Sequence, residues 1–252
     1  MAQLRTTVPF WSKWDGTRLK LKQEEVGSRE FDRGWRQKAL SDDEALFRES
    51  FITPCISHTA VMATLLDPHF KEAYPRNTKF YMGVDLAIAA SKSKGDYFVI
   101  TTIACSKDSQ SKSIVNIYRD RGLSFNQQLQ KVIEYGEFFK PDLIVVENNA
   151  YQDALSQELK RVSDLPISPF TTHHVNKNDL EGGLPRLSVG FEKGRWTIPM
   201  GDDFSSNQSS ILINEMLTYP IGVHDDNLMS LWFANKACEL LSSKIQKRIY
   251  VV

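Results

Sequence analysis

The stretch KFYMGVDLA, Lys79–Ala87, decides the fold that the sequence predicts. Its apolar residues alternate with a tyrosine and a glycine, which a buried central strand also accepts, so the stretch is expected to be a strand covered on both faces. Asp85 stands at the carboxyl end of that strand, behind the small Gly83. Aspartate is disfavoured in strands and costly to bury unless it is paired, hydrogen-bonded or bound to a metal. Asp85 is therefore a candidate site residue, with a turn or a cap as the ordinary alternative.

The next three strands follow from the same kind of pattern. The apolar runs Asp96 to Cys105 and Ser113 to Asp120 are separated by short polar turns, which predicts an antiparallel meander. A helical pattern after Ser124 leads to a short apolar run that ends in Glu147. Because this helical crossover returns the chain parallel to the first strand, Asp85 and Glu147 are expected at the same end of the sheet.

A fifth strand at Ile167 to Thr172 completes the expected fold class, α/β, with a mixed five-stranded sheet in the order 3-2-1-4-5 flanked by helices. The segment Pro185 to Pro199, PRLSVGFEKGRWTIP, predicts an appended β-hairpin around its Glu-Lys-Gly turn. Residues 1–78 are rich in charge and tryptophan and show no sheet pattern. They are expected to be an N-terminal linker or accessory segment, and residues 79–252 the sheet domain.

A final helix is predicted to begin near His224, and it opens with Asp225 and Asp226. Acidic residues at that position could simply be stabilised by the helix dipole. Together with Asp85 and Glu147, however, they form a set of carboxylates from distant parts of the sequence. Crowded carboxylates are unfavourable without a cation, and hard cations such as Mg²⁺ or Mn²⁺ prefer oxygen ligands. The set therefore indicates a two-metal phosphodiesterase site.

Composition limits the other possibilities. The 252 residues contain 31 Lys and Arg and 31 Asp and Glu, so any contact with nucleic acid must come from a local basic patch. The three cysteines are far apart and form no CxxC pair, which indicates free thiols in a reducing compartment rather than structural zinc. No apolar run approaches the length of a membrane span, and no signal peptide is evident, so we expect a cytoplasmic protein without membrane contact.

Four motifs in order resemble the nuclease domain of tailed-phage terminase large subunits, which has a ribonuclease H-like fold related to that of junction resolvases. They are GVDLA with the downstream GDYFV, then LIVVENN, then FEKGRWTIP, and finally HDDNLMSLWFA. The resemblance covers roughly residues 79–241. The N-terminal EEVGSREFDRGWRQKAL and EALFRES resemble the segment that joins the terminase ATPase to its nuclease. No GxxxxGK[ST] phosphate-binding loop occurs in the chain, so no ATP hydrolysis is expected.

The resemblance implies roles for the acids: Asp85 would contact both of two Mg or Mn ions, Glu147 one of them, and the Asp225–Asp226 pair the other. Many relatives carry a further acid where this chain has Met229. Asp225 would lie at the helix cap, whereas Asp226 lies about 100° further round and shares a face with Met229. We therefore expect Asp226 to be the metal ligand, and Asp225 to be a catalytic helper that caps the helix or holds a water molecule.

The implied activity is hydrolytic cutting of double-stranded DNA with little sequence preference during phage genome packaging. The implied partners are double-stranded DNA, a terminase ATPase domain, a small terminase subunit and a portal protein, in the cytoplasm of the infected bacterial host. A junction resolvase or transposase-like nuclease on the same fold is one alternative. A packaging scaffold or DNA-binding module without catalysis is another.

Several basic residues are candidates for DNA contact, although charged loops and hairpins are commonly just solvated. His224 could assist proton transfer or cap its helix. The candidate DNA-binding residues are Lys177, Arg186, Lys193, Arg195, His173 and His174.

Overall fold

The structure is a computed structural model that describes residues 18, 20–21, 45–87, 96–106, 111–147, 153–179 and 182–249. The chain divides into two compact units, Met1–Ala45 and Leu46–Val252. This division differs from the boundary expected at residue 78. Phe47, Ile52 and Met62 precede that boundary, yet all three are buried in the core of the second unit. Most of the expected N-terminal segment, residues 1–44, lies outside the described residues.

A seven-stranded sheet with the order β1-β7-β4-β3-β2-β5-β6 forms the centre of the second unit. The five strands expected from the sequence are β2 to β6, and their order is the predicted one. Strand β3 is antiparallel to β2 and to β4, and the other neighbouring pairs are parallel. The strands are β1 (Ile56–Ser57), β2 (Lys79–Asp85), β3 (Phe98–Cys105), β4 (Lys112–Asp120), β5 (Leu143–Glu147), β6 (Ile167–Phe170) and β7 (Trp196–Pro199).

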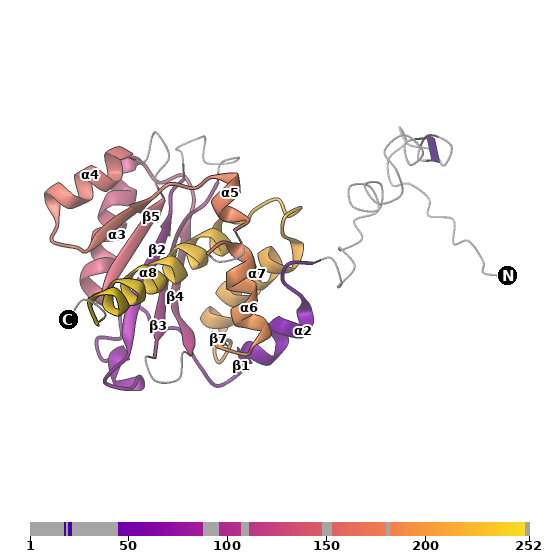
Figure 1. The fold of residues 1–252 in the computed structure, drawn as a ribbon, viewed down its shortest axis with the longest axis horizontal. Helices are drawn as coiled ribbons and strands as arrows, with labels where there is room; N and C mark the ends of the chain where they lie inside the picture. Colours follow the sequence, from indigo (N-terminus) through magenta and orange to yellow (C-terminus); the bar gives the residue numbers. More distant parts are fainter. Residues whose placement is uncertain are drawn as a thin grey trace. The chain divides into compact units, whose positions relative to one another are not determined.

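Helices cover both faces of this sheet (Figure 1). On one face α8 runs across β2, β3 and β5. The buried apolar residues form two clusters, and α3 packs against β2 and β3 within the second of them. Within the described residues, no helix is long and apolar enough to cross a membrane. The helices are α2 (Glu49–Ile52), α3 (Phe125–Phe139), α4 (Asp153–Val162), α5 (His174–Lys177), α6 (Leu184–Glu192), α7 (Asp203–Thr218) and α8 (Asp226–Ile249), with 3₁₀ turns at Thr53–Cys55 and Phe70–Ala73.

The β-hairpin expected at Pro185 to Pro199 is wrong, because its first half is the helix α6. Leu184, Leu187 and Phe191 are buried, and this spacing matches one face of a helix rather than a strand. Pro185 stands in the first turn, where its fixed backbone angle favours a helix. The second half is strand β7, which pairs in parallel with β4 and β1 instead of with the preceding segment.

Gly83 allows α8 to lie directly against the centre of the sheet. A methyl group at this position would overlap the backbone of α8 at Ser230, Phe233 and Ala234. A hydrogen bond of 2.6 Å between the hydroxyl oxygens of Ser230 and Thr101 also joins the helix to β3. The small residue behind Asp85 therefore sets how closely the start of α8 approaches the end of β2.

Candidate active site

The ends of β2 and β5 bring Asp85 and Glu147 to the same edge of the sheet. The two strands are parallel, and their register pairs Val84 with Val146, so the acids follow side by side. The start of α8 lies over the same end. A cleft of about 260 Å³ opens there, lined by five carboxylates and one lysine among its residues. The lining consists of Asp85, Leu86, Asp96, Glu147, Thr172, Lys177, Val223, His224, Asp225, Asp226 and Met229.

Asp85 is buried at the end of β2, with 8% of its surface exposed. Burial raises the pKa of its carboxyl well above the usual value, and Glu147 raises it further through its charge and a hydrogen bond. The charges of Asp226 and Asp225 act in the same direction. An ionised Asp85 in these surroundings needs a positive charge beside it, and a divalent cation would supply one.

Asp226 is buried and Asp225 is not, so the two aspartates have different surroundings. Asp226 is 7% exposed; among the described residues its Oδ2 atom accepts no hydrogen bond, and Nδ1 of His224 lies 3.4 Å from it. Burial raises the pKa of Asp226, an effect that the backbone N–H of Tyr97 partly offsets and that Asp96 adds to. Asp225 instead accepts a hydrogen bond of 2.8 Å from the ammonium group of Lys177. An unsatisfied buried carboxylate oxygen is costly, and this one faces a cleft where a cation would satisfy it.

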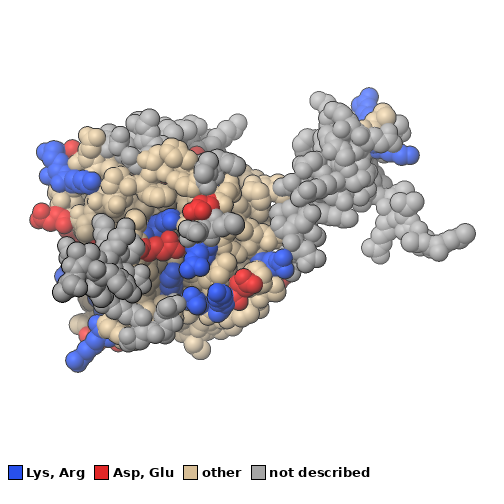
Figure 2. All heavy atoms as spheres, viewed as in Figure 1, with Lys and Arg blue, Asp and Glu red and all other residues tan. Residues whose placement is uncertain are grey.

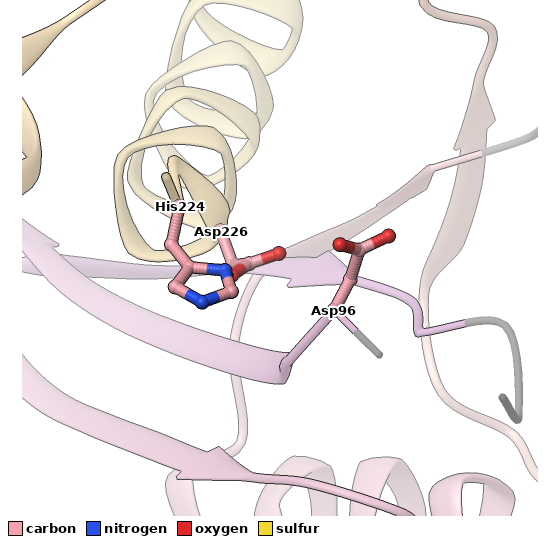
Figure 3. Close-up of side chains that lie close together, drawn as sticks. All are labelled: Asp96, His224 and Asp226. Carbon is pink, nitrogen blue, oxygen red and sulfur yellow. The ribbon is translucent and has the colours of Figure 1, made fainter. Parts of the chain in front are cut away.

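Asp96 is a candidate ligand that the sequence analysis did not single out. Its carboxylate, the His224 imidazole and the Asp226 carboxylate each offer a ligand atom, and these atoms lie within 4.8 Å of one another. Figure 3 shows His224 and Asp226 at the start of α8 facing Asp96, which leads into β3. The expected antiparallel pairing of β3 with β2 could have indicated Asp96, because this pairing places the beginning of β3 beside Asp85. Met229 lines the same cleft.

Glu215 of α7 performs the capping role that was expected of Asp225. It is 3% exposed, and its Oε2 atom accepts hydrogen bonds from the backbone N–H groups of Asn227 at 2.7 Å and Leu228 at 3.1 Å. These are first-turn N–H groups of α8, so Glu215 fixes the start of the helix that carries Asp226. The expectation that Asp225 caps this helix is therefore corrected, because its carboxylate is bonded to Lys177.

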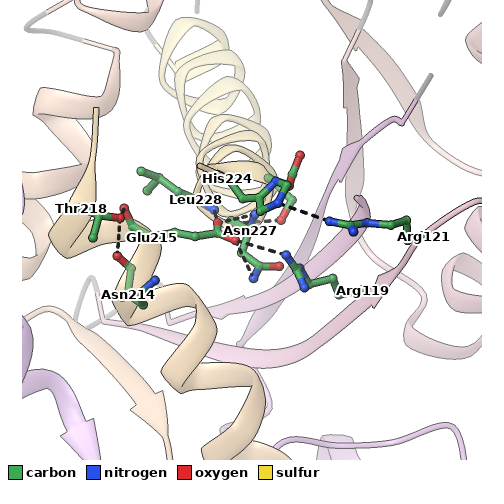
Figure 4. A network of polar contacts seen from close by, with 10 residues as sticks. Arg119, Arg121, Asn214, Glu215, Thr218, His224, Asn227 and Leu228 are labelled. Atoms are coloured by element: carbon green, nitrogen blue, oxygen red, sulfur yellow. Dashed lines mark hydrogen bonds and ion pairs between the residues drawn. The ribbon is translucent and has the colours of Figure 1, made fainter. Parts of the chain in front are cut away.

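Two arginines extend this contact network from strand β4 and the turn after it (Figure 4). Arg119 lies 3.9 Å from Glu215, and Arg121 lies 3.3 Å from Nε2 of His224. Both guanidinium groups stack on the ring of Tyr97, at 3.1 and 3.7 Å from its centroid. Burial nevertheless raises the pKa of Glu215 to about 7. No sequence motif marks Glu215 or the arginines, since a glutamate within a helix is usually solvated.

The basic residues expected to contact DNA do not form one surface. Lys177 lines the acidic cleft, whereas Arg186 and Arg195 line a second cavity together with Lys79, at the opposite end of β2. Lys193 is exposed just after α6. His173 is exposed before α5, and the side chain of His174 lies outside the described residues.

Comparison with known proteins identifies the fold. No protein-family model matches the chain, and no curated protein matches it in sequence. Among solved structures, the large terminase nuclease from thermophilic phage G20c with bound zinc is similar with a TM-score of 0.53 and 18% identity, over 76% of this chain and 97% of that one. Its magnesium-bound form gives a TM-score of 0.54 at 17% identity, over 76% and 96% of the two chains.

The nuclease domain of the phage P22 large terminase is similar with a TM-score of 0.51 and 10% identity, over 76% of this chain and 90% of that one. The chain therefore has the ribonuclease H-like fold of large terminase nucleases, as its motifs predicted.

Proposed function

We propose that this chain is a metal-dependent endonuclease that cuts double-stranded DNA with little sequence preference during phage genome packaging. The observation that carries the proposal is the convergence of Asp85, Glu147 and Asp226 on one cleft, where Lys177 is the single lysine or arginine among the described lining residues. The fold shared with phage terminase nucleases supports the same activity.

Two divalent ions, Mg²⁺ or Mn²⁺, fit the oxygen-rich lining of the cleft. Asp85 lies in the same cleft as Glu147 and Asp226, and the resemblance to terminase nucleases implies that it would hold both ions. Glu147 would hold one ion, and Asp226 with Asp96 would hold the other, with His224 as a further donor. When bound, the ions supply activation of a water molecule and stabilisation of the leaving oxygen in an in-line displacement.

Other side chains at or near the cleft would position the catalytic acids and the DNA rather than take part in bond breaking. Glu215 fixes the first turn of α8 and so holds Asp226 toward the cleft. Lys177 holds Asp225 and keeps a positive charge at the wall, where it would orient a DNA phosphate. Asp225 is thus a helper to the catalytic acids through Lys177 and not through the helix cap.

The proposed setting is the packaging machinery in the cytoplasm of the infected host. The partners would be DNA, a terminase ATPase domain, a small terminase subunit and a portal protein. The chain itself would not hydrolyse ATP, since it lacks the phosphate-binding loop. Faster cutting of four-way junctions than of linear duplexes would instead favour the resolvase alternative.

Cleavage of supercoiled plasmid tests the proposal. Wild-type protein is expected to nick and linearise plasmid with Mg²⁺ or Mn²⁺ and to lose all activity in chelator. Asp85→Asn should abolish cleavage, because it removes charge from the centre of the cleft at constant volume. Asp164→Asn is the matched control, since Asp164 is exposed and precedes β6, which is parallel to β5, so it lies toward the opposite end of the sheet from Glu147. Undiminished cutting in chelator, or by Asp85→Asn, would refute the proposed function.

A further inference from the structure

A second and larger cavity of about 480 Å³ lies at the opposite end of the sheet from the acidic cleft. Lys79, which begins β2, and its paired residue Cys105 of β3 both line it. Asp85 ends the same strand, and at about 3.3 Å per residue the two ends of β2 are roughly 20 Å apart. This cavity is therefore separate from the proposed nuclease site.

The described lining of the second cavity carries four cationic side chains and one carboxylate, that of Glu239. Lys79 is paired with Asp142, and Glu239 with Lys236. Lys112 donates a 2.5 Å hydrogen bond to the neutral Oδ1 of Asn235, and within the described part of the chain it forms no ion pair.

The two arginines of this cavity, Arg186 and Arg195, are both exposed. Among the residues that the structure describes, neither Arg186 nor Arg195 forms an ion pair or a side-chain hydrogen bond. Together with Lys112 they leave three positive charges around one concave space. Like charges repel, so such a set is stabilised by an anion bound between them.

Trp196 and Asn235 make this cavity a fixed structure rather than a loose gap. The ring of Trp196 stacks on Phe191 at 5.1 Å between centroids, and the ammonium group of Lys112 lies 5.4 Å from the Trp196 ring. Asn235 is 2% exposed and holds Lys112 from the other side. Lys112 is therefore oriented before any ligand arrives, which lowers the entropic cost of binding.

We propose that this cavity binds a phosphate group. Guanidinium groups match phosphate oxygens with paired hydrogen bonds, and lysine adds a point charge, whereas the volume suits a small ligand. The phosphate has two possible sources, a free nucleotide or a DNA strand that runs across this face. In Figure 2 Lys and Arg side chains gather on the face where α8 and α6 lie side by side. The proposal does not depend on nuclease activity.

Calorimetric titration of the full chain in chelator tests this site with three probes: inorganic phosphate, a nucleoside diphosphate and a 20-base-pair duplex. The double variant Arg186→Ala with Arg195→Ala is expected to weaken binding by about a hundredfold, at about tenfold for each charge-assisted contact. Lys160→Ala is the matched control, because this exposed lysine of α4 lines neither cavity. It should bind as the wild type does.

The three probes distinguish the sources. Binding of phosphate and the diphosphate identifies a small ligand, and binding of the duplex alone identifies a DNA strand; loss in the double variant supports the site in both cases. Equal affinity of wild type and double variant, or binding of none of the probes, overturns the proposal. Arg195→Gln, which keeps most of the side chain, repeats the test with about a tenfold loss expected if the double variant does not fold.

Discussion

Replacing Gly83 by alanine is expected to move the start of α8 away from the acidic cleft. The new methyl carbon would lie 2.9 Å from the carbonyl carbon of Phe233, and nearer still to backbone atoms of Ser230 and Ala234. Packed carbon atoms keep about 3.5–4.0 Å apart, so the helix or the strand must give way by at least about 0.6 Å. Backbone atoms cannot swing aside as a side chain can. The displacement therefore passes to Asp226 at the beginning of α8.

The size of this effect is measurable in both stability and activity. Overpacking of this kind costs about 1–3 kcal/mol, and a misplacement of about 1 Å lowers a catalytic rate by about a hundredfold. Urea unfolding should show the loss of stability, and plasmid cleavage with Mn²⁺ should show the loss of activity. The cleavage rate should fall by more than the decrease in the fraction of folded protein accounts for. In the control Gly182→Ala, the methyl group meets the flexible ammonium end of Lys236 and little should change. Wild-type stability and cleavage in Gly83→Ala would refute this reasoning.

Asp226→Asn is expected to abolish cleavage while Asp225→Asn keeps part of it, because Asp226 is buried beside the cleft with an oxygen that accepts no hydrogen bond from the described residues, whereas Asp225 is bonded to Lys177; equal losses in the plasmid assay would contradict this. Glu215 has a pKa of about 7 against an ordinary 4.5, so the native state binds more protons than the unfolded state between these values. The free energy of unfolding in chelator should therefore fall as pH rises through that window, and less steeply in Glu215→Gln; an unchanged slope would count against the assignment. Deleting residues 1–45 should leave the melting temperature of the second unit unchanged, whereas deleting residues 1–78 should abolish cooperative melting by circular dichroism, because it removes buried side chains. A stably folded fragment lacking residues 1–78 would restore the later boundary.

The centre of the fold could be predicted because its residues follow strong local rules. Strand β2 is a buried apolar run, and counting strand directions from it gave the order of five strands and the meeting of Asp85 with Glu147. Segment 185–199 resembles a hairpin in sequence because it contains glycines and β-branched residues. Its helical pattern of buried residues extends over only the nine residues of α6. Short apolar runs do not distinguish the two periods well.

The finer structure of the cleft depends on contacts that no local pattern contains. Glu215 reaches the start of α8 from another helix, and it is this packing that frees Asp225 to bind Lys177. Asp96 joins the cleft through the pairing of β3, and its role could have been inferred from the antiparallel direction of that strand. Counting strand directions predicts which strand ends lie together, but it does not predict which side chains form hydrogen bonds and ion pairs there.

Anomalous scattering from crystals soaked in Mn²⁺ tests most directly the claim that this cleft holds the catalytic ions. Two peaks are expected between Asp85, Glu147 and Asp226, with Asp96 beside the second peak and no peak in the second cavity. Asp85→Asn crystals should lose at least one peak. The absence of manganese between these carboxylates, with ordered peaks elsewhere on the chain, would contradict the account.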